Sequence, residues 1–140
     1  MTEMHLDLTV DAFYPHPREV VWAALIDAKA LATWLLENDF EPHVGREFTL
    51  RGPDIGEIRC TVLVLDPPRR MEWRWQSSTI SGPTRVVFSL EVAEGGTRLT
   101  VRHDGPTRLE HREAISGGWP KKLGVLAAWL DRSVTNPPAV

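Results

Sequence analysis

His103 is the polar residue of this sequence best placed for chemistry on a bound molecule. It follows Leu99 and Val101 at alternate positions of an expected strand, so the three side chains should share the inward face of that strand. A neutral imidazole in such a place can hydrogen-bond a ligand or transfer a proton. The competing interpretation, which the sequence favours, is a structural histidine that hydrogen-bonds a neighbouring carbonyl group or Tyr14.

Tryptophan is unusually frequent, with six residues against one tyrosine in a chain of 140. Because tryptophan is large and seldom fully buried, this number indicates an aromatic lining inside the fold. Trp34 and Trp119 are expected where helices border a cavity, although core packing explains them equally well. Trp73 and Trp75 share one strand face, where packing is the favoured interpretation. The candidate cavity residues are Trp34, Phe48, Trp73, Trp75, Phe88, His103, Trp119, Leu123 and Leu126.

The chain carries no sequence signal for a metal, nucleophile or nucleotide site. Cys60 is the single cysteine, which excludes an intrachain disulfide and a thiolate zinc site. The other four histidines show no ligand spacing, and no carboxylate cluster accompanies them. Neither a Gly-x-Ser-x-Gly elbow nor a Gly-x-Gly-x-x-Gly loop occurs. We therefore expect no metal and no cofactor, and only His103 as a catalytic residue if the protein is an enzyme.

The hydrophobic periodicity predicts the elements that must position these residues. Residues 4–13 alternate as a half-buried strand, and Pro17 and Asp27 then begin two short helices. From Arg46 to His103 the period is two, and short turns separate five strands, so their connections are antiparallel. The prediction is an α+β fold whose curved antiparallel sheet has six strands.

The C-terminal segment returns to a helical period. Pro120 should kink or restart this helix, because proline lacks an N–H group and crowds the preceding turn. The helix is the element available to cover the sheet, and a curved sheet that grips one helix can leave a space between them. Counted from about Thr107, the helix carries one apolar stripe, formed by Ile115, Trp119, Leu123, Leu126, Leu130 and Val134.

Length and composition are those of an ordinary globular chain. Hydrophobic residues make up 42% and charged residues 25%, and the length fits one domain, expected at 1–134 with a frayed tail at 135–140. The net charge of −3 and the scattered basic residues argue against nucleic-acid binding. The longest apolar runs have seven residues, too few for a membrane span, and the N-terminus lacks a secretory signal. A cytoplasmic protein is therefore expected.

Five motifs, in order along the chain, resemble one protein family. They are PREVVWAALID at 17–27 with Trp34, FEPHVGREF at 40–48, DPPRRMEW at 66–73, GGTRLTVRH at 95–103 and GWP at 118–120. Together they are similar to the domain named after the activator of the heat-shock-protein-90 ATPase, over about residues 8–133. That family belongs to the START-like, helix-grip superfamily (SRPBCC), which includes lipid-transfer proteins, plant pathogenesis-related proteins and polyketide cyclases.

The resemblance implies a helix-grip fold with a hydrophobic cavity between sheet and long helix, but no single activity, because one scaffold hosts many sites. Our leading hypothesis is a binding protein for an apolar or amphipathic small molecule. In it, Trp34, Trp73, Trp119 and Leu123 bury the ligand and His103 hydrogen-bonds it.

Two alternatives stay open. The first is a cyclase- or hydrolase-like enzyme that uses the same cavity and His103. The second is a co-chaperone-like protein-binding module. A chaperone partner is disfavoured, because the eukaryotic co-chaperone has an additional N-terminal domain that this sequence lacks. Exposed tryptophans or strand edges would also allow a homodimer.

Overall fold

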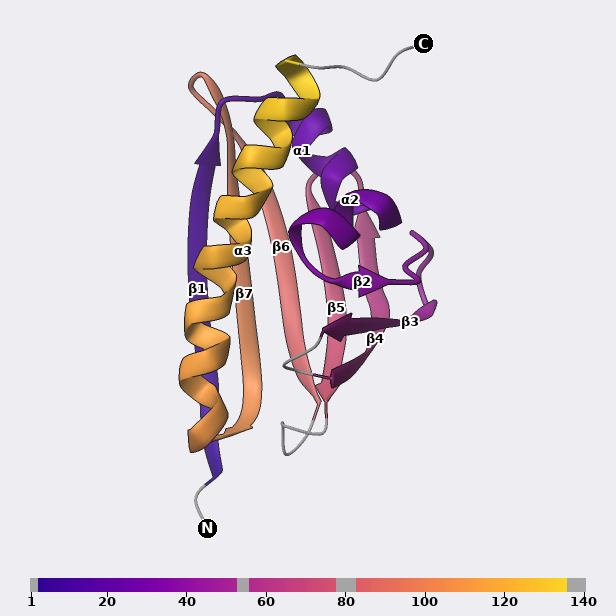
Figure 1. The fold of residues 1–140 in the computed structure, drawn as a ribbon, viewed down its shortest axis with the longest axis vertical. Helices are drawn as coiled ribbons and strands as arrows, with labels where there is room; N and C mark the ends of the chain where they lie inside the picture. The colour runs from indigo at the N-terminus through magenta and orange to yellow at the C-terminus, as the bar shows by residue number, and fades with distance from the viewer. Residues whose placement is uncertain (1–2, 53–55, 78–82, 136–140) are drawn as a thin grey trace.

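The computed structural model describes residues 3–52, 56–77 and 83–135, and shows a sheet wrapped around one long helix (Figure 1). The elements in chain order are β1 (Glu3–Tyr14), α1 (Arg18–Leu25), α2 (Ala28–Trp34), β2 (Glu37–Asn38), β3 (Glu47–Gly52), β4 (Gly56–Asp66), β5 (Arg70–Ser77), β6 (Thr84–Ala93), β7 (Gly96–Arg108) and α3 (Leu109–Thr135). This is the predicted order with one addition, β2. Two residues are too few to show an alternating pattern, so periodicity could not reveal this strand.

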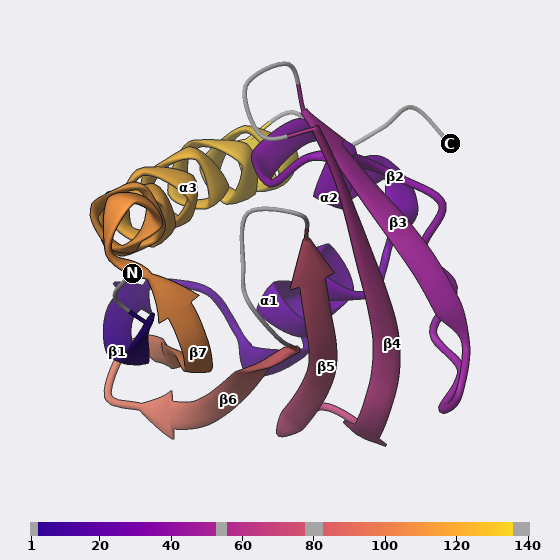
Figure 2. The ribbon, with the colours of Figure 1, turned by 90° about the horizontal axis from the view of Figure 1, so that it is seen from below.

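The strands form one antiparallel sheet in the order β1-β7-β6-β5-β4-β3-β2. Consecutive strands from β2 to β7 pair with one another, as their short connections require. β1 pairs instead with β7 along its whole length, from Glu3 opposite Arg108 to Tyr14 opposite Thr97. The first and last strands therefore lie side by side, and the sheet curves around the helices on its inner side (Figure 2).

The two short helices follow local signals in the sequence. Pro17 precedes α1, where a missing N–H group costs nothing. The carboxylate of Asp27 accepts a hydrogen bond from the Ala30 N–H at 3.1 Å, which confirms Asp27 as the cap of α2. Both helices bury their apolar sides in the common core.

α3 is one continuous helix that passes through Pro120, so the restart allowed by the sequence does not occur. It begins at Leu109 rather than near Thr107, because β1 pairs with residues up to Arg108 and holds them in β7. None of the described helices is long and apolar enough to cross a membrane. Thr135, expected in the frayed tail, is the last residue of α3, and the remainder of that tail, 136–140, lies outside the described residues.

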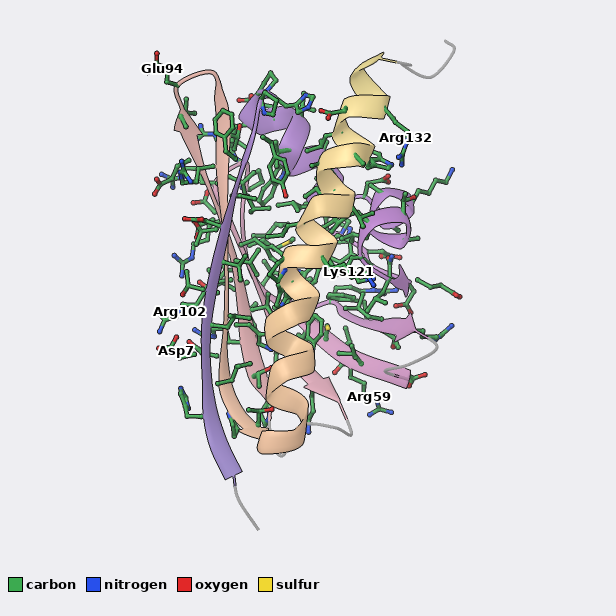
Figure 3. The ribbon with its side chains drawn as sticks, turned by 60° about the vertical axis from the view of Figure 1, so that its left-hand side comes forward. Asp7, Arg59, Glu94, Arg102, Lys121 and Arg132 are labelled. Atoms are coloured by element: carbon green, nitrogen blue, oxygen red, sulfur yellow. The ribbon has the colours of Figure 1, made fainter. Side chains whose placement is uncertain are left out.

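The outer face of the sheet carries charged residues that form ion pairs within and between strands. Glu72, which is only 6% exposed, lies 2.6 Å from Arg70 and 3.3 Å from Arg85. Asp7 lies 3.4 Å from Arg102 on the neighbouring strand (Figure 3). The polar positions of the strands therefore point away from the helices, and the alternate apolar positions form the core beneath them.

Candidate functional site

Aromatic rings from several elements meet on the inner side of the sheet. They come from β3, β5, β6 and β7, from α3, and from the connection between β2 and β3. All are buried, and the most exposed, Trp75, reaches only 9%. We call this set the aromatic cluster: Phe40, Phe48, Trp73, Trp75, Phe88, His103 and Trp119.

The cluster has two centres. The ring centroid of Trp73 lies 4.7 Å from that of Phe88, 4.9 Å from that of Phe48 and 5.7 Å from that of Phe40. The ring centroid of Trp119 lies 5.8 Å from that of Trp75 and 5.8 Å from that of Phe88. Phe88 therefore connects the two centres, because it contacts both Trp73 and Trp119. Most of these contacts are edge-to-face, an arrangement that adds about 0.5–1.5 kcal/mol per pair beyond area burial.

The period-two pattern of β5 and β6 produces this convergence. Trp73 and Trp75 are buried on one face of β5, whereas Arg74 between them is exposed. Trp73 pairs with Val86 of β6 and with Val62 of β4, so aliphatic side chains flank its backbone on both sides. The predicted common face of the two tryptophans is therefore confirmed.

A chain of hydrogen bonds holds His103 inside the cluster. The indole N–H of Trp119 donates to His103 Nδ1 at 3.1 Å. Because an indole nitrogen only donates, Nδ1 is the unprotonated nitrogen of the neutral ring and Nε2 carries the proton. Nε2 lies 2.7 Å from Thr84 Oγ1, and the Thr84 hydroxyl donates to the Trp75 carbonyl oxygen at 3.0 Å. Every hydrogen in this chain therefore has an acceptor.

Burial keeps His103 neutral. The side chain is fully buried, and loss of solvation lowers its pKa from 6.5 to about 4. Protonation of Nδ1 would also turn it into a donor that faces the N–H of Trp119. The geometry therefore suits a structural connection between β5, β6, β7 and α3.

The favoured interpretation of His103 was right in kind and wrong in its partners. Its nitrogens bind Thr84 and Trp119, neither a carbonyl group nor Tyr14. The Tyr14 hydroxyl donates instead to the Leu123 carbonyl oxygen at 2.9 Å, and burial raises the pKa of Tyr14 above its usual value. Thr84 is the first residue of β6 and alternates in phase with the buried Val86 and Phe88, but its side chain is polar, so the hydrophobic pattern did not mark it.

The remaining predicted cavity residues are buried in the same core. Leu123 and Leu126 lie on α3 at 3% and 0% exposure. Trp34 ends α2, and its indole N–H donates to the Ala24 carbonyl oxygen at 2.9 Å. No ring contact joins Trp34 to the aromatic cluster among the described residues, so its observed role is to hold α2 against α1.

Two features of the cluster were not anticipated. Phe40 belongs to no helix or strand, so no periodic pattern identified it, yet its ring packs 5.0 Å from that of Phe48. The Trp73 indole nitrogen is buried and has no hydrogen-bond acceptor within the described part of the chain. The cluster therefore combines apolar rings with one buried N–H group that has no acceptor among the described residues.

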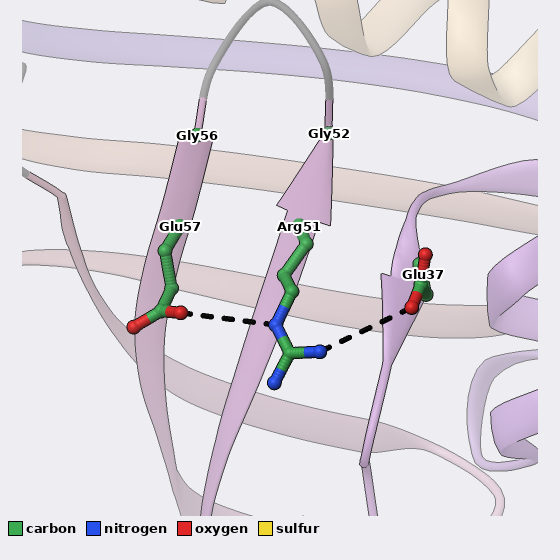
Figure 4. A pocket seen from close by; sticks show the side chains of 5 residues that line it. All are labelled: Glu37, Arg51, Gly52, Gly56 and Glu57. Atoms are coloured by element: carbon green, nitrogen blue, oxygen red, sulfur yellow. Dashed lines mark ion pairs between the residues drawn. The ribbon is translucent and has the colours of Figure 1, made fainter.

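A separate open pocket of about 400 Å³ lies on the surface, lined by Glu37, Arg51, Gly52, Gly56 and Glu57 (Figure 4). Arg51 stands between two carboxylates, 4.0 Å from Glu37 and 3.7 Å from Glu57. All three charged side chains are more than half exposed, so water screens them. Nothing in the sequence analysis pointed to this pocket, and it holds none of the candidate cavity residues.

The described residues contain no group of three or more histidine, cysteine, aspartate or glutamate side chains that could hold a metal ion. Cys60 is buried between Phe48 and Trp75 on the neighbouring strands, and burial raises the pKa of its thiol above the ordinary value. It therefore contributes to the core as a small apolar side chain.

A curved antiparallel sheet that closes on a long C-terminal helix, with two short helices after the first strand, defines a helix-grip protein. Solved structures share this architecture. MLL2253 from Mesorhizobium loti matches with a TM-score of 0.81 and 29% identity, over 91% of this chain and 98% of that chain. BH1534 from Bacillus halodurans matches with a TM-score of 0.77 and 25% identity, over 93% of this chain and 99% of that one.

DynU16, a protein of the dynemicin biosynthetic locus, has a TM-score of 0.80 and 24% identity, over 89% of this chain and 47% of its own. Residues 15–131 match the family described as Activator of Hsp90 ATPase homolog 1-like protein, and the chain belongs to that family. The resemblance seen in the sequence motifs is thereby confirmed. No curated protein sequence matches the chain.

Proposed function

We propose that this protein binds an apolar or amphipathic small molecule between the sheet and α3, among the rings of the aromatic cluster. The observation that carries the proposal is the convergence of these rings from separate elements on one buried region with few polar groups. Small-molecule sites typically combine such apolar walls with a few placed polar groups. The fold, which ligand-binding and polyketide cyclase-like proteins share, supports the same proposal.

In this proposal the tryptophans contact the ligand and His103 positions one of them. Both ring nitrogens of His103 already have protein partners, and one of these is the Trp119 indole. His103 therefore fixes the plane of the Trp119 ring, against which the ligand packs. The cyclase- or hydrolase-like alternative needs a group that exchanges protons with a substrate. Because both nitrogens of His103 are bonded to protein groups, this geometry favours the binding protein over the enzyme.

Extraction of the purified protein with organic solvent, followed by mass spectrometry, tests whether it carries an apolar molecule. A titration with the neutral fluorescent probe 1-aminoanthracene gives the number of sites. We expect one saturable site whose affinity falls about tenfold in Trp119→Leu, because a ring in the wall is lost.

Trp129→Leu is the matched control. Trp129 lies on the same helix but outside the aromatic cluster and is only partly buried, so the affinity should change less than about twofold. An extract without any apolar compound, together with unsaturable probe binding, would overturn the proposal. Equal losses of affinity in the two variants would place the site elsewhere.

A further inference from the structure

Trp73 differs from two other buried tryptophans of the core in the state of its indole N–H group. The N–H of Trp34 has the Ala24 carbonyl oxygen as acceptor, and that of Trp119 has His103. The Trp73 side chain is 0% exposed, and its N–H has no acceptor among the described residues. An unsatisfied buried donor destabilises the folded state, and most buried polar groups in folded proteins are paired. The unpaired donor therefore indicates a place for an acceptor that the polypeptide does not supply.

The surroundings of Trp73 define the chemistry of that acceptor. Its ring contacts are with Phe40, Phe48 and Phe88, and its strand neighbours are Val62 and Val86. An aromatic face is only a weak acceptor for an N–H group, so a molecule that brings an oxygen gains the stronger bond. No cationic side chain is among these neighbours, so a carboxylate placed there would lose its solvation without gaining a countercharge. The acceptor must therefore be neutral.

Phe40 provides the route by which a ligand could reach the donor. Among the rings around Trp73, it is the one that lies outside the helices and strands, in the connection from β2 to β3. The Phe40 backbone N–H donates to Asn38 Oδ1 at 3.0 Å, whereas Phe48 and Phe88 lie in paired strands. Moving the Phe40 ring would therefore leave the sheet intact.

We infer that the bound molecule is neutral, carries an aromatic or similar apolar group with a carbonyl or ether oxygen, and takes the place of the Phe40 ring so that this oxygen accepts the hydrogen bond of Trp73. This inference rests on the proposed function and specifies its ligand class. The protein thus selects within apolar compounds by one hydrogen bond rather than by charge.

A cavity made by Phe40→Ala allows a direct test, because an engineered apolar cavity of ring size can bind a small aromatic molecule. Acetophenone and ethylbenzene are the probes, since they have the same skeleton and differ by a carbonyl group in place of a methylene. Indole ¹H–¹⁵N spectra should resolve the tryptophans, and calorimetry gives both affinities. We expect acetophenone, but not ethylbenzene, to shift the Trp73 indole proton downfield.

The Trp73→Phe change in the Phe40→Ala background removes the donor. We expect acetophenone affinity to fall about tenfold and ethylbenzene affinity to change less than about threefold. Trp34→Phe, in the same background, is the control, since its N–H already has a protein acceptor and the ratio of the two affinities should stay constant. The remaining indole signals report whether each variant is folded. The shift of the Trp73 signal in the Phe40→Ala variant shows whether the oxygen of the probe accepts its hydrogen bond, even if the double variant does not fold.

The outcomes separate the two proposals. If both probes bind Phe40→Ala but the Trp73 signal responds equally to them, the oxygen acceptor is wrong while binding among the aromatic rings stands. If neither probe binds the folded Phe40→Ala variant, the aromatic cluster is no ligand site, and both proposals fail. A downfield shift with acetophenone alone supports both.

Discussion

At the scale of single residues, the protonation state of His103 controls a chain of four groups. The Trp119 N–H donates to the imidazole, the imidazole donates to the Thr84 hydroxyl, and that hydroxyl donates to the Trp75 carbonyl oxygen, so all three bonds run in one direction. A proton added at Nδ1 removes the acceptor of Trp119 and places a charge in a fully buried position. These three hydrogen bonds can therefore form together only when His103 is neutral.

The buried, neutral state of His103 predicts that the free energy of unfolding depends on pH. The folded-state pKa of His103 is about 4, below the 6.5 of an exposed histidine, so between these values the unfolded chain binds the proton that the folded chain excludes. The contribution of His103 to the free energy of unfolding is fully present above pH 6.5. It falls by about 3 kcal/mol as the pH drops toward 4. Urea unfolding between pH 7 and pH 4 measures the loss.

The His103→Gln variant tests whether His103 causes the loss of stability at low pH. Glutamine can accept from Trp119 and donate to Thr84 without titrating, so we expect a cost of about 1–3 kcal/mol at pH 7 and a smaller slope between pH 6.5 and 4. The exposed His43 serves as control, and His43→Gln should keep the wild-type slope. A slope unchanged in His103→Gln would show that other groups cause the acid sensitivity.

At the scale of elements, Gly105 lets β6 and β7 approach each other beside this chain of bonds. It has a φ of +136°, in a region that favours glycine, and a Cβ atom there would lie 2.9 Å from both Cα and Cγ2 of Thr84. Thr84 is the residue that receives the His103 bond. A small residue in β7 is therefore needed for the position of a side chain in β6.

Gly105→Ala should consequently destabilise the fold by about 2 kcal/mol or more, through backbone strain and displacement of Thr84. Gly124→Ala is a control for which we expect the opposite effect. Nothing lies within 4 Å of a Cβ atom at this position, and alanine forms helices better than glycine, so the free energy of unfolding should rise by about 1 kcal/mol. Denaturant midpoints compare the two variants. A neutral Gly105→Ala would mean that β6 moves aside without cost.

At the scale of the whole molecule, two contacts tie the end of β1 to α3. The Tyr14 hydroxyl donates to the Leu123 carbonyl oxygen across 109 positions of sequence, and His16 Nε2 lies 2.9 Å from Asp131 Oδ1 across 115. β1 also pairs with β7, the strand that leads directly into α3. The N-terminal strand therefore joins the structure only when the C-terminal part of the chain is in place.

Tyr14→Phe tests this coupling between sheet and helix. Losing the buried hydroxyl should cost about 0.5–1.5 kcal/mol and leave the tryptophan fluorescence and far-ultraviolet circular dichroism transitions coincident, because the core is shared. Thr33→Val removes an exposed hydroxyl bond to Lys29 and should change the stability by less than about 0.5 kcal/mol. Separate transitions for the two signals in Tyr14→Phe would contradict a single cooperative core.

Local sequence features were enough to predict much of the fold. The alternation in β5 indicated a shared face for Trp73 and Trp75, and the Asp27 side chain caps α2 as expected. The apolar stripe of α3 correctly predicted the burial of Trp119, Leu123, Leu126 and Leu130, whereas the side chains of its other two members, Ile115 and Val134, lie outside the described residues. These features depend on neighbours within a few residues, so their physical cause is present in the sequence itself.

Local patterns thus predicted every helix and strand except β2, and the motifs indicated the family. The partners of His103, the place of Phe40 in the aromatic cluster and the unpaired N–H of Trp73 follow instead from how the elements pack together. Each depends on groups brought together from distant positions, such as Trp75, Thr84 and Trp119 around His103. No local period records such encounters, because hydrogen-bond partners and ring contacts are set by the packing of the sheet against α3.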